Sequence, residues 1–174
     1  PAALYHRTHL STTSESASES ASHRISCALS PEQTKALKKL SLNSAAAAFT
    51  PQLSLFNLVA GLVLAYLSRI SDSEQVAFAT PAQGRPSAAF KKTIGVFIEL
   101  FPLGVSVEPD ETFESLLAKV TEASGHLLRY AQPGASEFAA HRDVNVVLNF
   151  LTAKVSKFAG HPVRAQWLHA GASD

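Results

Sequence analysis

The strongest constraint on the fold is a long apolar stretch, which runs from Leu53 to Leu67. It follows the pair Thr50-Pro51, a helix start signal, because threonine caps a helix and proline suits its first turn. The predicted helix reaches about Arg69 and is apolar on most of its circumference, and such a helix belongs inside a protein. The stretch contains a serine and an asparagine and falls short of the roughly 18 residues that a membrane span needs. We therefore expect a buried core helix.

A polar tail precedes this helix. Residues 1–23 include the run STTSESASESAS, which has no apolar periodicity and nothing to bury, and which predicts a flexible serine-rich linker. Residues 24–174 are then expected to form one domain. Residues 25–29 (ISCAL) predict a short strand, in which Cys27 is a small buried hydrophobe rather than a nucleophile.

A short helix is predicted between this strand and the core helix. Ser30 is its cap, Pro31 suits its first turn, and Gln33 is the reciprocal capping-box partner. The helix is expected to end near residues 40–43.

Extended segments follow the core helix. Residues 75–80 (QVAFAT) predict a strand, and residues 81–86 (PAQGRP) predict a loop because of their two prolines and glycine. Residues 96–107 predict a long extended segment that is broken at Pro102 and Gly104. We expect its Phe97, Glu99 and Phe101 face to be exposed, because aromatic and charged side chains share it.

The last part of the chain predicts a helix and two strands. The helix is capped by Asp110, carries leucines and a valine on one face, and ends near residues 132–134. Residues 144–150 (VNVVLNF) predict a strand buried on both faces, and residues 163–168 (VRAQWL) a final strand. Strands and helices therefore interleave, so the predicted class is α/β with a mixed sheet flanked by helices, since some connections are too short for a crossover helix.

Composition narrows the function. The net charge is +1 over 174 residues, which provides no strong field for nucleic acid or an anionic membrane, and we expect neither as a partner. A single cysteine excludes an internal disulfide, and no zinc spacing is present, so no metal is expected. This cysteine usage suits the cytoplasm.

Four segments, in this order, resemble the second half of the condensation domains of non-ribosomal peptide synthetases. Residues 79–85 (ATPAQGR) are similar to the family turn G-T-P-x-x-G-R, and residues 94–105 (IGVFIELFPLGV) to the signature I-G-x-F-(V/I)-(N/E)-x-x-P-L-R-V. Residues 113–120 (FESLLAKV) resemble the helix T-F-x-x-L-L-x-x-V, and residues 141–150 (HRDVNVVLNF) an R-D segment that enters a strand. The stretch after residue 157 is similar as well.

The resemblance implies one lobe of a two-lobe, chloramphenicol-acetyltransferase-like acyltransferase fold. The implied reaction forms an amide or ester bond between acyl and aminoacyl thioesters held on 4'-phosphopantetheine arms, with no cofactor bound by the domain itself. The implied partners are peptidyl or acyl carrier proteins and the N-terminal lobe. The site would mainly position reactants, while a histidine assists proton transfer.

The chain departs from the family pattern at informative places. The family arginine after P-L is Gly104, the asparagine of the signature is Glu99, and the leading glycine of the turn is Ala79. The motif H-H-x-x-x-D-G, which carries the catalytic histidine in the N-terminal lobe of the family, does not occur in these 174 residues. Residues 169–174 (HAGASD) reproduce only its outer spacing, with Ala170 where a base is needed. No catalytic residue is therefore assigned, and we expect the chain alone to be inactive.

Four residues are candidates for the wall of the substrate tunnel: Arg85, Glu99, Asn145 and Asn149. For the arginine and the two asparagines a structural role is the alternative. Glu99 is expected either at a lobe edge or paired with Arg85 or a lysine, because an unpaired buried carboxylate is costly. Two further hypotheses stay open: a non-catalytic module that docks carrier proteins or pairs with a separate lobe, and an unrelated α/β domain.

Overall fold

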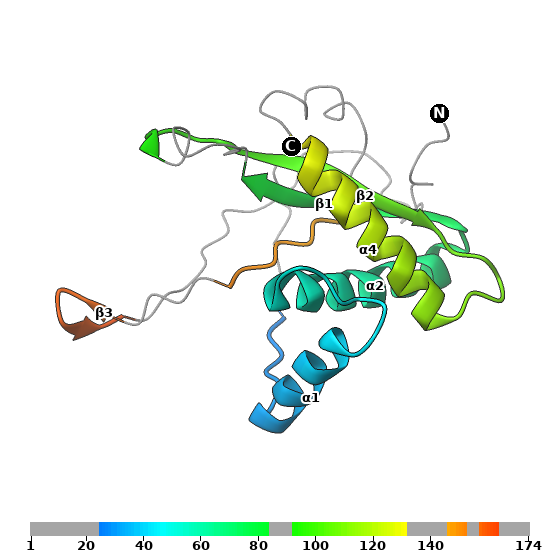
Figure 1. The fold of residues 1–174 in the computed structure, drawn as a ribbon, viewed down its shortest axis with the longest axis horizontal. Coiled ribbons are helices and arrows are strands. Elements are labelled where there is room, and N and C mark those ends of the chain that lie inside the picture. The colour runs from blue at the N-terminus through cyan, green and yellow to red at the C-terminus, as the bar shows by residue number, and fades with distance from the viewer. Residues whose placement is uncertain (1–24, 84–91, 132–145, 153–156, 164–174) are drawn as a thin grey trace, which may run out of the picture.

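The computed structural model describes residues 25–83, 92–131, 146–152 and 157–163. The elements are α1 (Pro31–Leu42), α2 (Pro51–Ser71), β1 (Gln75–Gln83), β2 (Ile98–Ser106), α4 (Phe113–Tyr130), β3 (Lys157–Phe158) and β4 (His161–Pro162). β1 and β2 form a long ribbon, α4 crosses it, and α2 and α1 follow below (Figure 1). Helices together with a small sheet confirm the predicted α/β class.

The first helix begins as predicted. The Ser30 hydroxyl accepts a hydrogen bond from the backbone N–H of Gln33 (3.2 Å), whose side chain accepts one from the Ser30 N–H (2.8 Å). The predicted strand at residues 25–29 is wrong, because these residues are exposed and have no regular structure. Among the described residues no strand pairs with them, and Cys27 is exposed rather than buried.

The core helix α2 is confirmed, although one side of it faces outward. The Thr50 hydroxyl accepts from the Leu53 N–H (3.2 Å), and the helix ends at Asp72, whose φ of 49° is left-handed. Leu58 and Leu64 are fully buried, whereas Tyr66 is 64% exposed. In the described chain α2 is the one helix long and apolar enough to cross a membrane, a test that core helices also pass, and it packs against α1, β1 and α4.

β1 and β2 pair antiparallel over their full length, from Gln75 opposite Ser106 to Gln83 opposite Ile98. Two predictions are therefore wrong. Residues 81–83 continue the strand instead of opening a loop, and the second strand is not broken at Pro102 or Gly104.

The hydrogen-bond pattern explains why the prolines are tolerated. Ala79 uses its own N–H and C=O with Val146 and Leu148, on the side away from β2. Its partner Pro102 therefore belongs to a non-hydrogen-bonded pair, and the N–H that proline lacks would point to the outer edge. Pro81 lies two residues after Ala79, so its nitrogen points to the same side of β1, away from β2. Neither proline therefore removes a hydrogen bond between β1 and β2.

Residues 146–150 run beside β1 but form no strand. One parallel bridge joins Ala79 to Val147, with hydrogen bonds from Ala79 N–H to Val146 (2.9 Å) and from Leu148 N–H to Ala79 (2.8 Å). The prediction of a strand buried on both faces is wrong, because Val147 is 52% exposed. The parallel bridge gives the sheet region its mixed character.

The helix α4 begins two residues later than predicted. Thr112, not Asp110, is the cap, and its hydroxyl accepts from the Ser115 N–H (3.1 Å). Leu116, Leu117 and Val120 are buried, which confirms the middle of the predicted apolar face. Phe113 and Leu128, which were expected on the same face, are 39% and 49% exposed.

One side of the β1–β2 ribbon carries the core. Its buried residues come from α2, β1, β2 and α4: Ala60, Leu64, Val76, Phe78, Leu103, Leu116 and Val120. Gly61 lets the two helices approach closely, because a Cβ there would lie 2.6 Å from a methyl of Leu117.

Two predicted segments fall outside the described residues. These are the linker at residues 1–23 and nearly all of the strand at 163–168. Its first residue, Val163, follows a two-residue hairpin of β3 and β4 and is not in a strand. The end of the last helix is described: α4 ends at Tyr130, a few residues before the predicted end near residues 132–134.

Candidate functional site

A cavity of about 450 Å³ opens where the start of α2, the end of α4 and the last residues of β1 meet. Its size is within the range of small-molecule pockets, roughly 300–1,000 Å³. Most of its wall is apolar: Phe49, Leu53, Phe56, Leu103, Leu127, Leu128 and Phe150. The rings of Phe56 and Phe150 meet edge to face at 6.0 Å.

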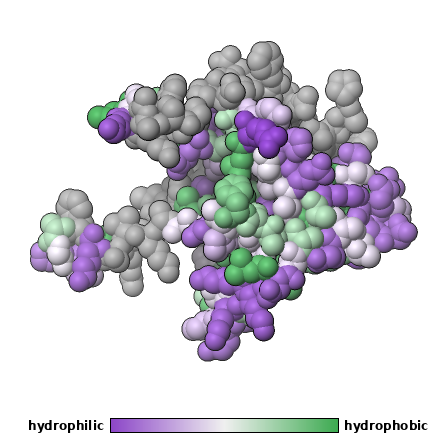
Figure 2. Space-filling model, viewed as in Figure 1, coloured by the Kyte–Doolittle hydropathy of each residue, from purple (hydrophilic) through white to green (hydrophobic). Residues whose placement is uncertain are grey.

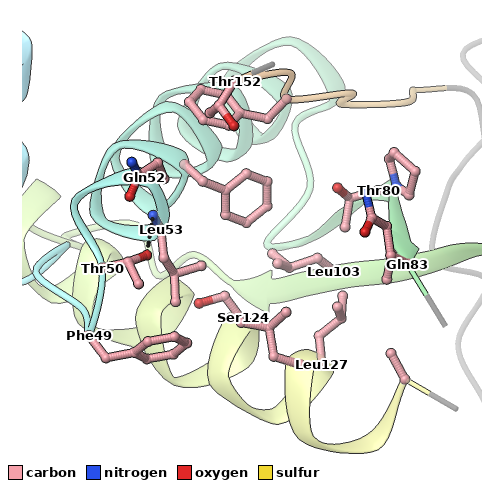
Figure 3. A pocket seen from close by; sticks show the side chains of 16 residues that line it. Phe49, Thr50, Gln52, Leu53, Thr80, Gln83, Leu103, Ser124, Leu127 and Thr152 are labelled. Atoms are coloured by element: carbon pink, nitrogen blue, oxygen red, sulfur yellow. Dashed lines mark hydrogen bonds between the residues drawn. The ribbon is translucent and has the colours of Figure 1, made fainter. Parts of the chain in front are cut away.

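The cavity has walls on opposite sides that come from distant parts of the chain. In Figure 3, Phe49 and Leu53 lie on one side, with Leu103 and Gln83 across from them. Ser124 and Leu127 of α4 lie below, and the segment that carries Thr152 lies above. Five stretches of sequence therefore build one site, because Leu103 comes from β2 and Gln83 from β1.

Two buried hydroxyls reach this cavity, and both already donate to backbone carbonyls. Thr80 donates to Leu148 (3.0 Å), and Ser124 donates to Thr121 (3.0 Å). Each hydroxyl oxygen keeps acceptor capacity but has no second proton to give. Of the other polar side chains in the wall, Gln52, Gln83 and Thr152 are exposed, and Thr50 is half-buried, with its hydroxyl oxygen accepting from the Leu53 N–H.

A small side chain on the inner face of α4 makes room for the cavity. Val120, Ser124 and Leu127 follow one another on that face at helical spacing, and Ser124 is only 2% exposed. A leucine at that position would extend the apolar face into the cavity.

A second cavity, also about 450 Å³, is polar and charged and lies between the end of α2 and the start of α4. On its wall, the Glu111 carboxylate accepts hydrogen bonds from the Lys119 ammonium and the Ser115 hydroxyl. Lys119, and then Ser115, lower the pKa of Glu111 from 4.5 to about 2. Lys119 also donates to the Ser106 carbonyl (3.0 Å), so this arrangement ties α4 to β2.

The predicted site residues do not converge on the cavity. Glu99 is half-buried in β2 opposite Ala82, and Asn149 is exposed just before Phe150, so both lie near the last half of β1 without lining the cavity. Arg85 and Asn145 fall outside the described residues. The pairing of Glu99 with Arg85 therefore stays a prediction.

The residues that do line the cavity were missed. Phe56 and Leu53 were assigned only to core packing, and Thr80 and Gln83 to a strand and a loop. One feature of the sequence could have indicated the cavity: Ser124 is a small polar residue on an otherwise apolar helix face. In the described part of the chain no three histidine, cysteine, aspartate or glutamate side chains gather as a metal site.

Comparison with known proteins defines the family. The family model "Condensation domain" matches residues 3–146, so this chain belongs to the condensation-domain family and is not an unrelated α/β domain. The match includes residues 3–23, and the linker prediction for that segment stays untested.

Curated relatives are large peptide synthases, of which this chain matches a small part. A component of the linear gramicidin synthase from Brevibacillus parabrevis is 27% identical over 119 residues, which are 67% of this chain and 1% of that protein. A component of the plipastatin synthase from Bacillus subtilis (strain 168) is 25% identical over 101 residues, 58% of this chain and 3% of that protein.

Solved condensation domains share the fold. The first condensation domain of the calcium-dependent antibiotic synthetase, in complex with a substrate analogue, superposes with a TM-score of 0.56 at 23% identity. This superposition covers 68% of the chain and 26% of the solved one. Another structure of that domain gives a TM-score of 0.55 at 26% identity and covers 27% of the solved chain. The chain thus spans about a quarter of each solved chain.

Proposed function

We propose that this chain is one lobe of a condensation domain that forms an amide or ester bond in non-ribosomal peptide synthesis. The observation that carries the proposal is the family match over residues 3–146, and the shared fold of solved condensation domains supports it. The substrates would be acyl and aminoacyl thioesters on the 4'-phosphopantetheine arms of carrier proteins. The single cysteine suits the cytoplasm, which we propose as the location.

In this proposal the chain positions reactants and does not supply the base. Thioesters are already activated, so orientation contributes much of the rate. The two histidines of the described residues, His126 and His161, are exposed, and neither lines the apolar cavity. The motif H-H-x-x-x-D-G is absent from the 174 residues. The base is therefore proposed to come from a partner lobe that carries that motif.

Complementation tests this division of labour. The purified chain is mixed with an aminoacyl donor carrier and an acceptor carrier, with and without a separately expressed N-terminal lobe, and the condensed product is followed by mass spectrometry. We expect product only with both lobes, and none when the second histidine of the motif is replaced by alanine. Product from the chain alone, abolished by replacing His141 or His169, would overturn the proposal.

The same experiment distinguishes the catalytic lobe from the alternative function, a non-catalytic docking module. A non-catalytic docking module would bind a carrier protein, seen as a saturable change in carrier amide resonances, yet give no product with any N-terminal lobe. We favour the catalytic lobe because the family match covers most of the chain, including the turn and the signature strand.

A further inference from the structure

The wall of the apolar cavity is apolar in its inner part and polar at its rim. Its inner part is formed by the partly buried side chains Leu53, Phe56 and Leu127 together with the buried Leu103. Its rim carries exposed amide and hydroxyl groups from Gln52, Gln83 and Thr152. A ligand that fits this gradient has an apolar body and a small polar head that stays near water.

Charge restricts the head group. None of the described residues that line the cavity carries a charge at neutral pH. An ionised carboxylate or ammonium would lose hydration there without a partner of opposite charge. The head group is therefore uncharged, as in an amide, an ester or a thioester.

The buried polar atoms favour an apolar body. Thr80 and Ser124 already donate their protons to the carbonyls of Leu148 and Thr121. A buried carbonyl or ether oxygen of a ligand would find no free donor on these two side chains. An unsubstituted alkyl chain needs none.

We propose that this cavity binds the alkyl chain of an acyl group, with its neutral thioester or amide head at the rim of Gln52, Gln83 and Thr152. The choice of an acyl thioester among neutral alkyl ligands rests on the proposed function. The binding of a neutral alkyl chain rests on the cavity alone.

Acyl thioesters of N-acetylcysteamine, which carry an amide and a thioester and no charge, are the probes. Acetyl, hexanoyl and octanoyl thioesters are titrated into the full chain, and amide resonances are followed by two-dimensional NMR. We expect saturable shifts at Thr80, Ser124 and Leu127, with affinity rising about three- to fourfold per methylene from hexanoyl to octanoyl. Octanoate and octylammonium ions should bind at least tenfold more weakly.

Two filling variants and one matched control test the location. Ser124→Leu and Ala82→Leu each add apolar volume to the cavity wall from a different element. Either variant that keeps a native spectrum should lose at least tenfold in octanoyl affinity. Ala118→Leu adds the same side chain to the exposed face of α4 and should bind like the parent chain.

The idea fails if the octanoyl probe does not bind, if its shifts centre on the exposed residues Ile98 and Leu100, or if a folded filling variant binds like the parent. Equal binding of octanoate would overturn the neutral head. If octanol bound as tightly as the octanoyl probe, the acyl thioester would be overturned as the preferred ligand, and the cavity would be a site for any neutral alkyl chain. Because the readout is binding to this chain alone, it is independent of the complementation assay.

Discussion

Glu111 lies just before α4, and its carboxylate is held from several directions. It accepts from Lys119 and Ser115, and the Glu108 backbone N–H donates to it at 3.3 Å. Its side chain is only 6% exposed, whereas that of Lys119 is 37% exposed. Together these contacts join the loop after β2 to the second turn of α4.

This carboxylate should make folding depend on pH. The pKa of Glu111 falls to about 2 from 4.5, so its contribution to stability is complete above pH 4.5 and is lost as pH falls towards 2. We expect Glu111→Gln to lower the free energy of unfolding at pH 7 and to flatten its pH dependence between pH 4.5 and 2. Urea titrations at pH 7, 4 and 2.5 measure both effects.

The exposed carboxylate of Glu122, on the same helix, is the matched control. Glu122→Gln should keep the pH dependence of the parent chain. An unchanged acid slope in Glu111→Gln would show that the contacts around Glu111 do not stabilise the fold.

At the scale of elements, β1 lies close against Gly104 of β2. A Cβ at that position would lie 2.8 Å from the Cβ of Ala77 and 3.1 Å from the Val76 carbonyl. The family pattern has an arginine there, and the Cβ of any such side chain would require Ala77 or the strand to shift. The glycine that replaces the family arginine therefore fits the close packing of β1 against β2 at this position.

Gly104→Ala should lower the free energy of unfolding by about 1–3 kcal/mol, because the added methyl meets fixed backbone and Cβ atoms. Adding Ala77→Gly should restore part of the loss. Gly125→Ala is the control, since its Cβ would meet nothing within 4 Å, and it should stabilise α4 by about 0.5–1 kcal/mol. Urea unfolding measures all four chains, and a neutral Gly104→Ala would contradict the close approach.

At the scale of the whole molecule, an apolar row faces outward along β2 and the residues before it. Ile94, Val96, Ile98 and Leu100 alternate along the chain, and the last two are 59% and 48% exposed. The sequence predicts that the face of Phe97, Glu99 and Phe101 is exposed. This prediction is wrong, because Phe101 is only 9% exposed. Figure 2 shows further apolar residues gathered down the middle of the view between polar flanks.

We expect the isolated chain to self-associate at micromolar concentration, since burying apolar surface yields about 25 cal/mol per Å². Sedimentation velocity should show a smaller average mass for Ile98→Ser/Leu100→Ser than for the parent chain. Leu42→Ser, a similarly exposed leucine on α1, should change the mass little. A monomeric parent, or equal effects of both changes, would contradict a role for this row.

The predictions that were confirmed depend on short-range chemistry. Ser30 and Gln33 cap α1 as their spacing indicates, Thr50 starts α2, and the apolar spacing of α4 marks its buried face. The family followed from motifs that are contiguous in the chain. The cavity did not follow, because its wall joins Leu103 with residues 49–56, 80–83, 124–131 and 150–152. Only the packing of α2, β1, β2 and α4 brings these residues together.

The order of residues alone thus specified where α1 and α2 begin, where α4 begins to within two residues, and which family the chain belongs to, because capping, periodicity and motifs are local. The three-dimensional packing was needed to show that Pro102 continues a strand, that Cys27 is exposed and that Ser124 opens a cavity. The cost of a missing N–H or of a small side chain depends on the neighbour opposite it, and neighbours are set by packing.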